Sequence, residues 1–147
     1  MALLSKLYPQ NDTVKCYLRS VLSSVSNYRG LEMQQDIPQL PVVLDELFAS
    51  FEKDLLRIPA QPDAFFFRTQ KNVYDSLTQQ YFSYSGPTSM GKSFVMRMFI
   101  KERITKGYTE NYVIVVPTKA LINEVSTKII DDLKSLLPKH NYRVITS

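Results

Sequence analysis

The sequence predicts an α/β fold: a partial parallel sheet with helices on both faces, preceded by a helical N-terminal segment. Two observations carry this prediction. From residue 81 onward, strand-like runs alternate with amphipathic helices in the order strand, helix, strand, helix, strand. The run at residues 112–116 is continuously apolar and β-branched, as in a parallel strand that is buried on both faces. Right-handed crossovers then join the strands into one doubly wound sheet.

Length and composition set the broad class. The 147 residues suffice for one modest domain, and the apolar content of 44% is typical of a globular protein. No run approaches the length of a membrane span, and residues 1–7 lack the long apolar core of a secretory signal. Cys16 and His140 are the only residues of their types, which excludes an intrachain disulfide and a Cys-rich zinc site. We therefore expect a cytoplasmic protein with no membrane partner.

The net charge of +4 is unevenly distributed. Residues 1–91 hold 8 Lys/Arg and 9 Asp/Glu, whereas residues 92–147 hold 10 and 5, so the two parts sum to −1 and +5. A basic surface on the second part would suit a polyanion such as a nucleic acid. The alternative is a solvated face of lysine-rich helices.

The N-terminal segment is expected to be helical. Residues 12–28 have apolar positions three and four apart, with capping residues at the start and Gly30 at the end. A second helix can begin at Pro41. We expect its apolar residues to point inward: Val42, Val43, Leu44, Leu47, Phe48, Phe51, Leu55 and Leu56.

Two prolines, Pro59 and Pro62, interrupt the helical pattern and mark a predicted boundary between segments 1–62 and 63–147. A third helix is expected from Arg68 to about Gln80. The remaining elements follow in order: a strand at 81–85, a glycine loop, a helix that ends at Gly107, a strand at 112–116, an amphipathic helix closed by Pro138, and a strand at 142–146.

The glycine loop matches the phosphate-binding pattern G-x-x-x-x-G-K-[ST] at residues 86–93, between a predicted strand and a predicted helix. Backbone N–H groups at a helix N-terminus, aided by the helix dipole, provide the donors that a polyphosphate needs. Gly86 and Gly91 permit conformations and close approaches that a Cβ would obstruct. Lys92 suits the β- and γ-phosphates, and the Ser93 hydroxyl suits Mg²⁺. Thr88, Ser89 and Met90 contribute mainly main-chain donors. The alternative is a chance match.

A second motif narrows the class of nucleotide-binding protein that the sequence indicates. A predicted strand runs into the segment Val-Val-Pro-Thr-Lys-Ala-Leu-Ile-Asn-Glu at residues 115–124, and Pro-Thr occurs both here, at Pro117-Thr118, and at residues 87–88. Together the two segments resemble motifs I and Ia of superfamily 2 helicases, in the DEAD/DEAH-box-like and superkiller-type groups. The resemblance covers the chain from about residue 66 onward. It implies a RecA-like domain that binds ATP and Mg²⁺ and grips a single strand of DNA or RNA.

The resemblance also implies residue roles. Lys92 and Ser93 would serve the phosphates and Mg²⁺, while Pro117, Thr118 and Lys119 would touch the nucleic-acid backbone. The second role fits the expected fold, because a loop after a parallel strand lies at the carboxyl edge of the sheet, where such folds bind ligands. Thr and Lys are ordinary phosphate partners. The alternative for Lys119 is a solvated lysine near a helix start.

Gln70 lies near the place of the adenine-reading glutamine of these helicases. Its amide could donate to N7 and accept from N6 of adenine, and Phe67 or Arg68 could stack on the base. The spacing of Arg68 and Gln70 departs from the usual pattern, so a surface glutamine on a helix is the alternative.

The helicases also carry an Asp-Glu motif that holds Mg²⁺ and the attacking water. No such motif occurs on a predicted strand here, and Asp131-Asp132 is interpreted as the solvated face of a helix. We therefore expect the N-terminal portion of a longer helicase, which hydrolyses ATP negligibly alone and works with the remaining domains or a partner protein. The alternatives are a regulatory module that binds a partner through residues 1–60 and has a vestigial loop, or a different phosphate-loop ATPase.

Overall fold

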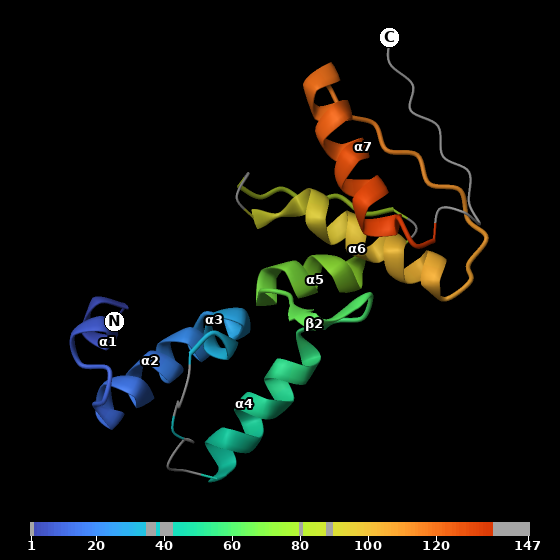
Figure 1. Ribbon diagram of the computed structural model, residues 1–147. Helices are drawn as coiled ribbons and strands as arrows, with labels where there is room; N and C mark the ends of the chain where they lie inside the picture. Colours follow the sequence, from blue (N-terminus) through green and yellow to red (C-terminus); the bar gives the residue numbers. More distant parts are fainter. Residues whose placement is uncertain (1, 35–37, 39–42, 80, 88–89, 137–147) are drawn as a thin grey trace. The chain divides into compact units, whose positions relative to one another are not determined.

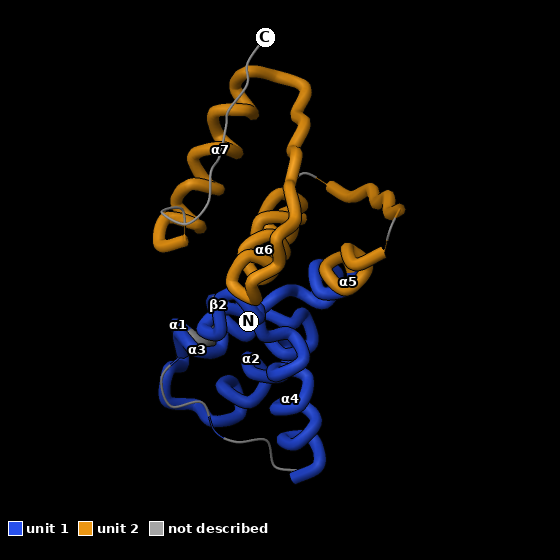
Figure 2. The backbone as a smooth tube through the Cα atoms, turned by 90° about the vertical axis from the view of Figure 1, so that its right-hand side faces the viewer, with its two compact units in different colours: residues 1–72 blue, residues 73–147 orange. Residues whose placement is uncertain are grey.

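The structure is a computed structural model that describes residues 2–34, 38, 43–79, 81–87 and 90–136 (Figure 1). It is mostly helical and forms two compact units, residues 1–72 and 73–147 (Figure 2). The division falls within helix α5 (Arg68–Ser76). The two prolines of the sequence predict an earlier boundary, between residues 62 and 63.

The first unit contains four helices among its described residues: α1 (Ala2–Leu7), α2 (Asp12–Ser24), α3 (Tyr28–Glu32) and α4 (Val43–Leu55). Helix α2 begins where the sequence predicts, because the Asn11 side chain accepts a hydrogen bond from the backbone N–H of Val14 at 3.1 Å. It ends earlier than predicted. Ser26 adopts a positive φ of 55°, and Asn27 then caps α3 by accepting from the Gly30 N–H at 3.0 Å. Gly30 therefore lies inside a short helix rather than beyond a long one.

A β-hairpin follows α4. Strand β1 (Arg57–Ile58) pairs antiparallel with β2 (Gln61–Phe65) in the only sheet among the described residues. The segment that the sequence treats as a proline-interrupted boundary is therefore a tight hairpin. Its surroundings form the core of the first unit, whose most buried side chains are Tyr28, Leu56, Ile58 and Phe66.

Helix α4 does not bury the apolar face that its sequence periodicity predicts. None of its residues is buried, and Leu44, Leu47, Phe48 and Phe51 each expose more than 60% of their surface. Only Leu56, just after the helix, belongs to the core. The expectation that this face points inward is wrong for the described structure, and Val42 lies outside the described residues.

The second unit is built on α6 (Lys92–Thr105) and α7 (Lys119–Leu133), which contact one another. Gly107 follows the end of α6, as predicted. Its φ of 81° lies in the left-handed region, which few residues other than glycine adopt easily. The Tyr74 ring packs edge-on against Phe99, with ring centroids 5.8 Å apart, and ties the end of α5 to α6. The buried side chains of this unit are Tyr74, Val95, Met98, Ile100 and Leu133.

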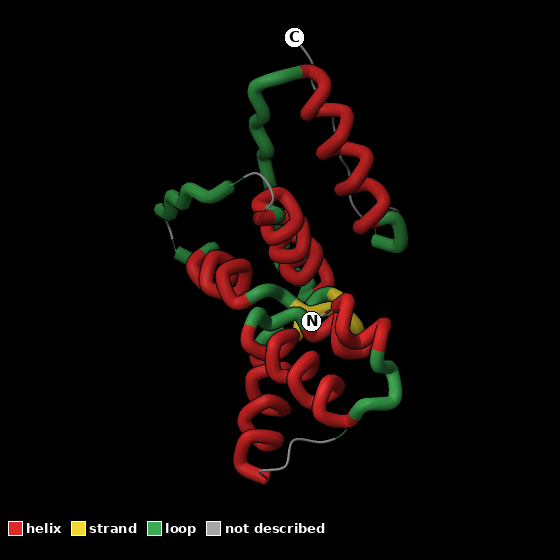
Figure 3. The backbone as a smooth tube through the Cα atoms, turned by 90° about the vertical axis from the view of Figure 1, so that its left-hand side faces the viewer, coloured by secondary structure: helices red, strands yellow, loops and turns green. Residues whose placement is uncertain are grey.

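The predicted parallel, RecA-like sheet with helices on both faces is wrong. Residues 81–85 and 112–116 are not strands; Figure 3 draws them as loops, and the predicted strand at 142–146 lies outside the described residues. The second segment shows why. Val113 and Val115 are 86% and 88% exposed, whereas Ile114 and Val116 are partly covered. The alternation expected of an extended chain is present, but no strand among the described residues pairs with this segment to make it part of a sheet.

Among the described residues, no helix has the length and apolar content needed to cross a membrane.

Candidate phosphate-binding site

The glycine loop is closed by hydrogen bonds from the lysine that follows it. The Lys92 ammonium donates to the carbonyl oxygens of Gly86 at 2.6 Å and Pro87 at 2.9 Å. Inside the loop, the Met90 N–H donates to the Pro87 carbonyl at 3.1 Å. A positive charge is thus held against the backbone of the loop, on a side chain that is only partly exposed.

Helix α6 begins directly at this lysine. Gly91 is its N-cap, in a left-handed conformation with φ 77° and ψ 35°, and the Gly91 carbonyl accepts the first helical bond, from Val95 N–H, at 3.1 Å. Among the described residues, no side chain caps the helix start. The first N–H groups of a helix have no carbonyl partner in their own helix, and the helix dipole places partial positive charge there. Together with Lys92 they favour an anion at this position.

The two glycines of the loop are required for different reasons. Gly91 supplies the positive φ, which costs other residues conformational energy. At Gly86 a Cβ would lie 2.5 Å from the Met90 sulfur, so the constraint is the contact with a side chain that could move aside. Met90 itself lies inside the turn, whereas Thr88 and Ser89 are outside the described residues.

Two aromatic residues stand immediately before the loop. The Tyr84 hydroxyl donates to the Lys92 carbonyl at 3.3 Å, and the Tyr84 ring stacks on Phe82 with centroids 5.4 Å apart and an interplanar angle of 26°. Burial raises the pKa of Tyr84 further above neutral pH, where a tyrosine hydroxyl is protonated and can donate this hydrogen bond in any case. Both residues belong to the predicted strand at 81–85, and their link to the loop is not predicted from the sequence. Their i, i+2 spacing, which places two aromatic side chains on one side of an extended chain, is the signal that could have revealed the pair.

The described residues contain no cluster of three or more His, Cys, Asp or Glu that could hold a metal ion. The Ser93 hydroxyl beside the loop stays the predicted ligand for Mg²⁺. Ser93 is exposed in the first turn of α6, next to Lys92 in the chain. A serine hydroxyl is a hard oxygen ligand and Mg²⁺ commonly takes most of its remaining ligands from water and phosphate, so this donor fits the ion only together with a phosphate.

The predicted adenine reader, Gln70, lies in the first unit, whereas the loop lies in the second. Gln70 is 8% exposed, and its side-chain oxygen accepts a hydrogen bond from the Phe67 N–H at 3.0 Å. Phe67 is 48% exposed, and Arg68 forms an ion pair with Glu52. The structure thus gives Gln70 a role at the start of α5, and its contact with adenine stays a prediction.

The predicted nucleic-acid residues Pro117, Thr118 and Lys119 are all exposed at the start of α7. The Thr118 side chain caps that helix by accepting from the Leu121 N–H at 3.3 Å. At the other end of α7, Asp132 pairs with Arg97 of α6. Asp132 is therefore a link between two helices rather than part of a solvated face, while Asp131 is exposed as expected.

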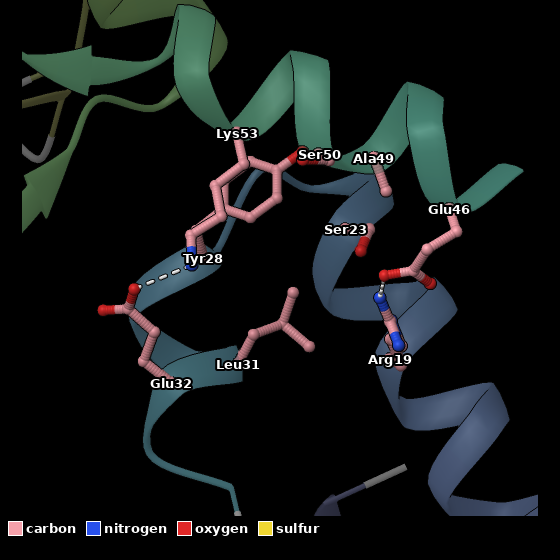
Figure 4. Close-up of a pocket in the computed structure, with 9 residues that line it drawn as sticks. All are labelled: Arg19, Ser23, Tyr28, Leu31, Glu32, Glu46, Ala49, Ser50 and Lys53. Atoms are coloured by element: carbon pink, nitrogen blue, oxygen red, sulfur yellow. Dashed lines mark hydrogen bonds and ion pairs between the residues drawn. The ribbon is translucent and has the colours of Figure 1, made fainter. Parts of the chain in front are cut away.

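The first unit holds a separate open cavity of about 400 Å³ between α2, α3 and α4 (Figure 4). Ion pairs lie at its two ends, Arg19 with Glu46 and Lys53 with Glu32. The hydroxyl oxygens of Ser23 and Tyr28 line the cavity, are buried, and have no hydrogen-bond partner among the described residues. No sequence pattern indicates this cavity, because its lining comes from residues that are scattered along three helices.

Comparisons of the chain with protein-family models, with curated proteins and with solved structures find no match.

Proposed function

We propose that the chain binds the polyphosphate of ATP, with Mg²⁺, through residues 86–93. The observation that carries this proposal is the placement of the Lys92 ammonium, 2.6 Å and 2.9 Å from two carbonyl oxygens of the loop that precedes it. The loop backbone, the ammonium and the start of α6 are thereby gathered around one small region. A charged donor beside a helix N-terminus is a chemical match for a phosphate.

Lys92 is well suited to exchange partners. Neutral carbonyls accept weaker hydrogen bonds from an ammonium than a charged phosphate oxygen does. An arriving polyphosphate would draw the ammonium from Gly86 and Pro87 and would meet the N–H groups at the start of α6. The Ser93 hydroxyl would then join the coordination of Mg²⁺ with phosphate oxygens. Because the carbonyls are solvated once Lys92 leaves them, this exchange needs no large rearrangement.

ATP binding by the 147-residue chain in the presence of Mg²⁺, measured by isothermal titration calorimetry, tests this proposal. Lys92→Ala is expected to weaken binding at least tenfold, since it removes the charged donor of the loop. Lys101→Ala is the matched control: it removes the same charge from the same helix, farther from the loop, and should retain wild-type affinity. Equal ATP affinity in the wild type and Lys92→Ala would contradict the proposal.

We extend the proposal to nucleic acid, as the helicase resemblance of residues 115–124 implies. The full function is then that of an ATP-dependent helicase or translocase segment, with Pro117, Thr118 and Lys119 on the nucleic-acid backbone. The exposure of all three residues supports it, as does the charge of +5 on residues 92–147. Lys119→Ala should weaken binding of a fluorescent single-stranded oligonucleotide, and Lys134→Ala, at the far end of the same helix, should not. Identical losses in the two variants would indicate nonspecific charge attraction instead.

A partner-binding module is the second candidate, and the exposed apolar face of α4 favours it. Single exposed apolar residues are common, but Leu44, Leu47, Phe48 and Phe51 form one stripe along a helix. In this candidate the glycine loop is vestigial. The calorimetric titration separates the two candidates, because a vestigial loop predicts that Lys92→Ala leaves ATP binding unchanged.

A further inference from the structure

The aromatic pair before the glycine loop has a defined relation to the phosphate-binding residues. Phe82 and Tyr84 stack with ring centroids 5.4 Å apart, and the Tyr84 hydroxyl donates to the carbonyl of Lys92, the lysine that closes the loop. The stack is therefore fixed to the first residue of α6 at one end. At the other end of the stack, Phe82 is 37% exposed.

We propose that Phe82 is a stacking platform for the base of the bound nucleoside triphosphate, with Tyr84 behind it as the residue that positions its ring. This inference rests on the proposed function, because it concerns the same nucleotide. It assigns the base to the second unit, beside the loop. It also needs no contribution from Gln70 of the first unit.

The distance along the chain is suitable. Phe82 precedes Gly86 by four residues, and four residues of extended chain span at most about 14 Å. A nucleoside triphosphate whose phosphates lie at the loop can therefore reach back along residues 82–86 with its ribose and base. The hydrogen bond from Tyr84 to Lys92 keeps the beginning of this segment close to the loop rather than letting it extend away.

The chemistry of the pair favours a flat ligand. Aromatic rings prefer offset stacking, and the interplanar angle of 26° between Phe82 and Tyr84 approaches that arrangement. A base can continue such a stack, and stacking tolerates every base because each has a π-face. Phe82 should therefore strengthen binding of ATP and GTP alike. Tyr81 is 85% exposed and has no ring contact with the pair among the described residues, so it should not take part.

Phosphate and base contributions can be separated by comparing ATP with inorganic tripolyphosphate, both with Mg²⁺, by calorimetry. Phe82→Leu should weaken ATP binding by about five- to a hundredfold, the range found when base-stacking aromatic residues are removed. It should leave tripolyphosphate binding unchanged, which also shows that the loop is intact. Tyr81→Leu is the matched control and should alter neither ligand. Lys92→Ala should weaken both.

The chain contains no tryptophan, so Phe82→Trp introduces a single fluorescent reporter at the proposed platform. Its emission should change on addition of ATP or GTP and stay constant on addition of tripolyphosphate.

The stacking proposal is contradicted if Phe82→Leu binds ATP with wild-type affinity, or if the Trp emission is unchanged at saturating ATP. Neither result would contradict phosphate binding by the loop. Equal weakening of ATP and tripolyphosphate by Phe82→Leu also contradicts the stacking proposal, because the ring would then support the loop and not the base. An emission change with a single-stranded oligonucleotide but not with ATP assigns the ring to nucleic acid and overturns the platform as well. If the wild-type chain binds neither ATP nor tripolyphosphate, the proposed function and the platform fall together.

Discussion

The Lys92 ammonium lies 2.6 Å from the carbonyl oxygen of Gly86, so the lysine of the phosphate pattern is bonded to the first glycine of the same pattern. Its side chain links the start of α6 to the beginning of the loop, in addition to the hydrogen bond from the Met90 N–H to the Pro87 carbonyl. Two consequences follow. Lys92 engages the loop carbonyls before any ligand binds, and a ligand that takes this ammonium must also replace its contacts with Gly86 and Pro87.

The shape of the loop should depend on the positive φ of Gly91. Gly91→Ala forces an L side chain into the left-handed region, which costs about 1–2 kcal/mol per residue. We expect a comparable loss in the free energy of unfolding, measured by urea denaturation, together with a loss of tripolyphosphate affinity. Gly107→Ala provides the control, since Gly107 has a similar φ of 81° and a Cβ there would meet no atom within 4 Å. It should lower stability by a similar amount and leave phosphate binding intact; a loss of phosphate binding in both variants would show that destabilisation alone explains the effect.

Two large apolar residues should respond very differently to truncation. Met98 of α6 is fully buried, and Met98→Ala should destabilise the second unit by about 2–5 kcal/mol, the usual range for such cavities. Phe48 of α4 is 70% exposed, so Phe48→Ala should change the unfolding free energy much less. Urea denaturation followed by circular dichroism compares them. If Phe48→Ala lowered the free energy of unfolding as much as Met98→Ala does, the result would show that the α4 face is covered in solution.

The sequence predicts local structure in this chain better than it predicts tertiary structure. The start of α2 at Asn11 and the helix after the glycine loop follow from capping residues and from periodicity, which act within a few residues. The glycine loop is likewise local, and its lysine donates to carbonyls five and six residues away. Features of this kind are encoded by neighbours in the chain.

The errors arise where a local pattern must be converted into long-range pairing. The apolar run at 112–116 indicates an extended conformation, but a sheet also requires partner strands that the pattern does not specify. The apolar stripe of α4 indicates an amphipathic helix, but not which surface covers it. The contact of Tyr84 with Lys92 joins residues 8 positions apart, and the pairing of Arg97 with Asp132 joins residues 35 positions apart. No rule of sequence spacing predicts either contact.

The ion pair between Arg97 of α6 and Asp132 of α7 should hold the two helices together. The Arg97 side chain is 13% exposed, its Nε is buried without a partner among the described residues, and it also donates to the Lys128 carbonyl at 3.2 Å. Asp132→Asn removes the negative charge and should cost about 1–3 kcal/mol, as for hydrogen bonds to charged groups. Asp131→Asn, at the exposed neighbouring position, is the control and should be nearly neutral. Equal stability of the two variants in urea denaturation would argue against the link.

Tyr28 should make the first unit sensitive to alkaline pH. Burial, together with the nearby Glu52 carboxylate, raises its pKa from 10.0 to about 12. The folded state therefore keeps the hydroxyl protonated where the unfolded state begins to ionise. The stability associated with the neutral hydroxyl is fully present below pH 10 and is lost as the pH rises through about 12.

Tyr28→Phe removes this titration, so a comparison of the variant with the wild type isolates the contribution of the Tyr28 hydroxyl to stability. The substitution removes the hydroxyl that titrates, which lies near the Glu52 carboxylate, and keeps the buried ring, so its effect on stability at pH 7 should be small. Between pH 10 and 12, the variant should retain stability that the wild type loses, in thermal unfolding followed by circular dichroism. Tyr8→Phe, at a position with 56% exposure, should retain the wild-type loss. Parallel declines of the wild type and Tyr28→Phe over this range would place the alkaline sensitivity at another residue.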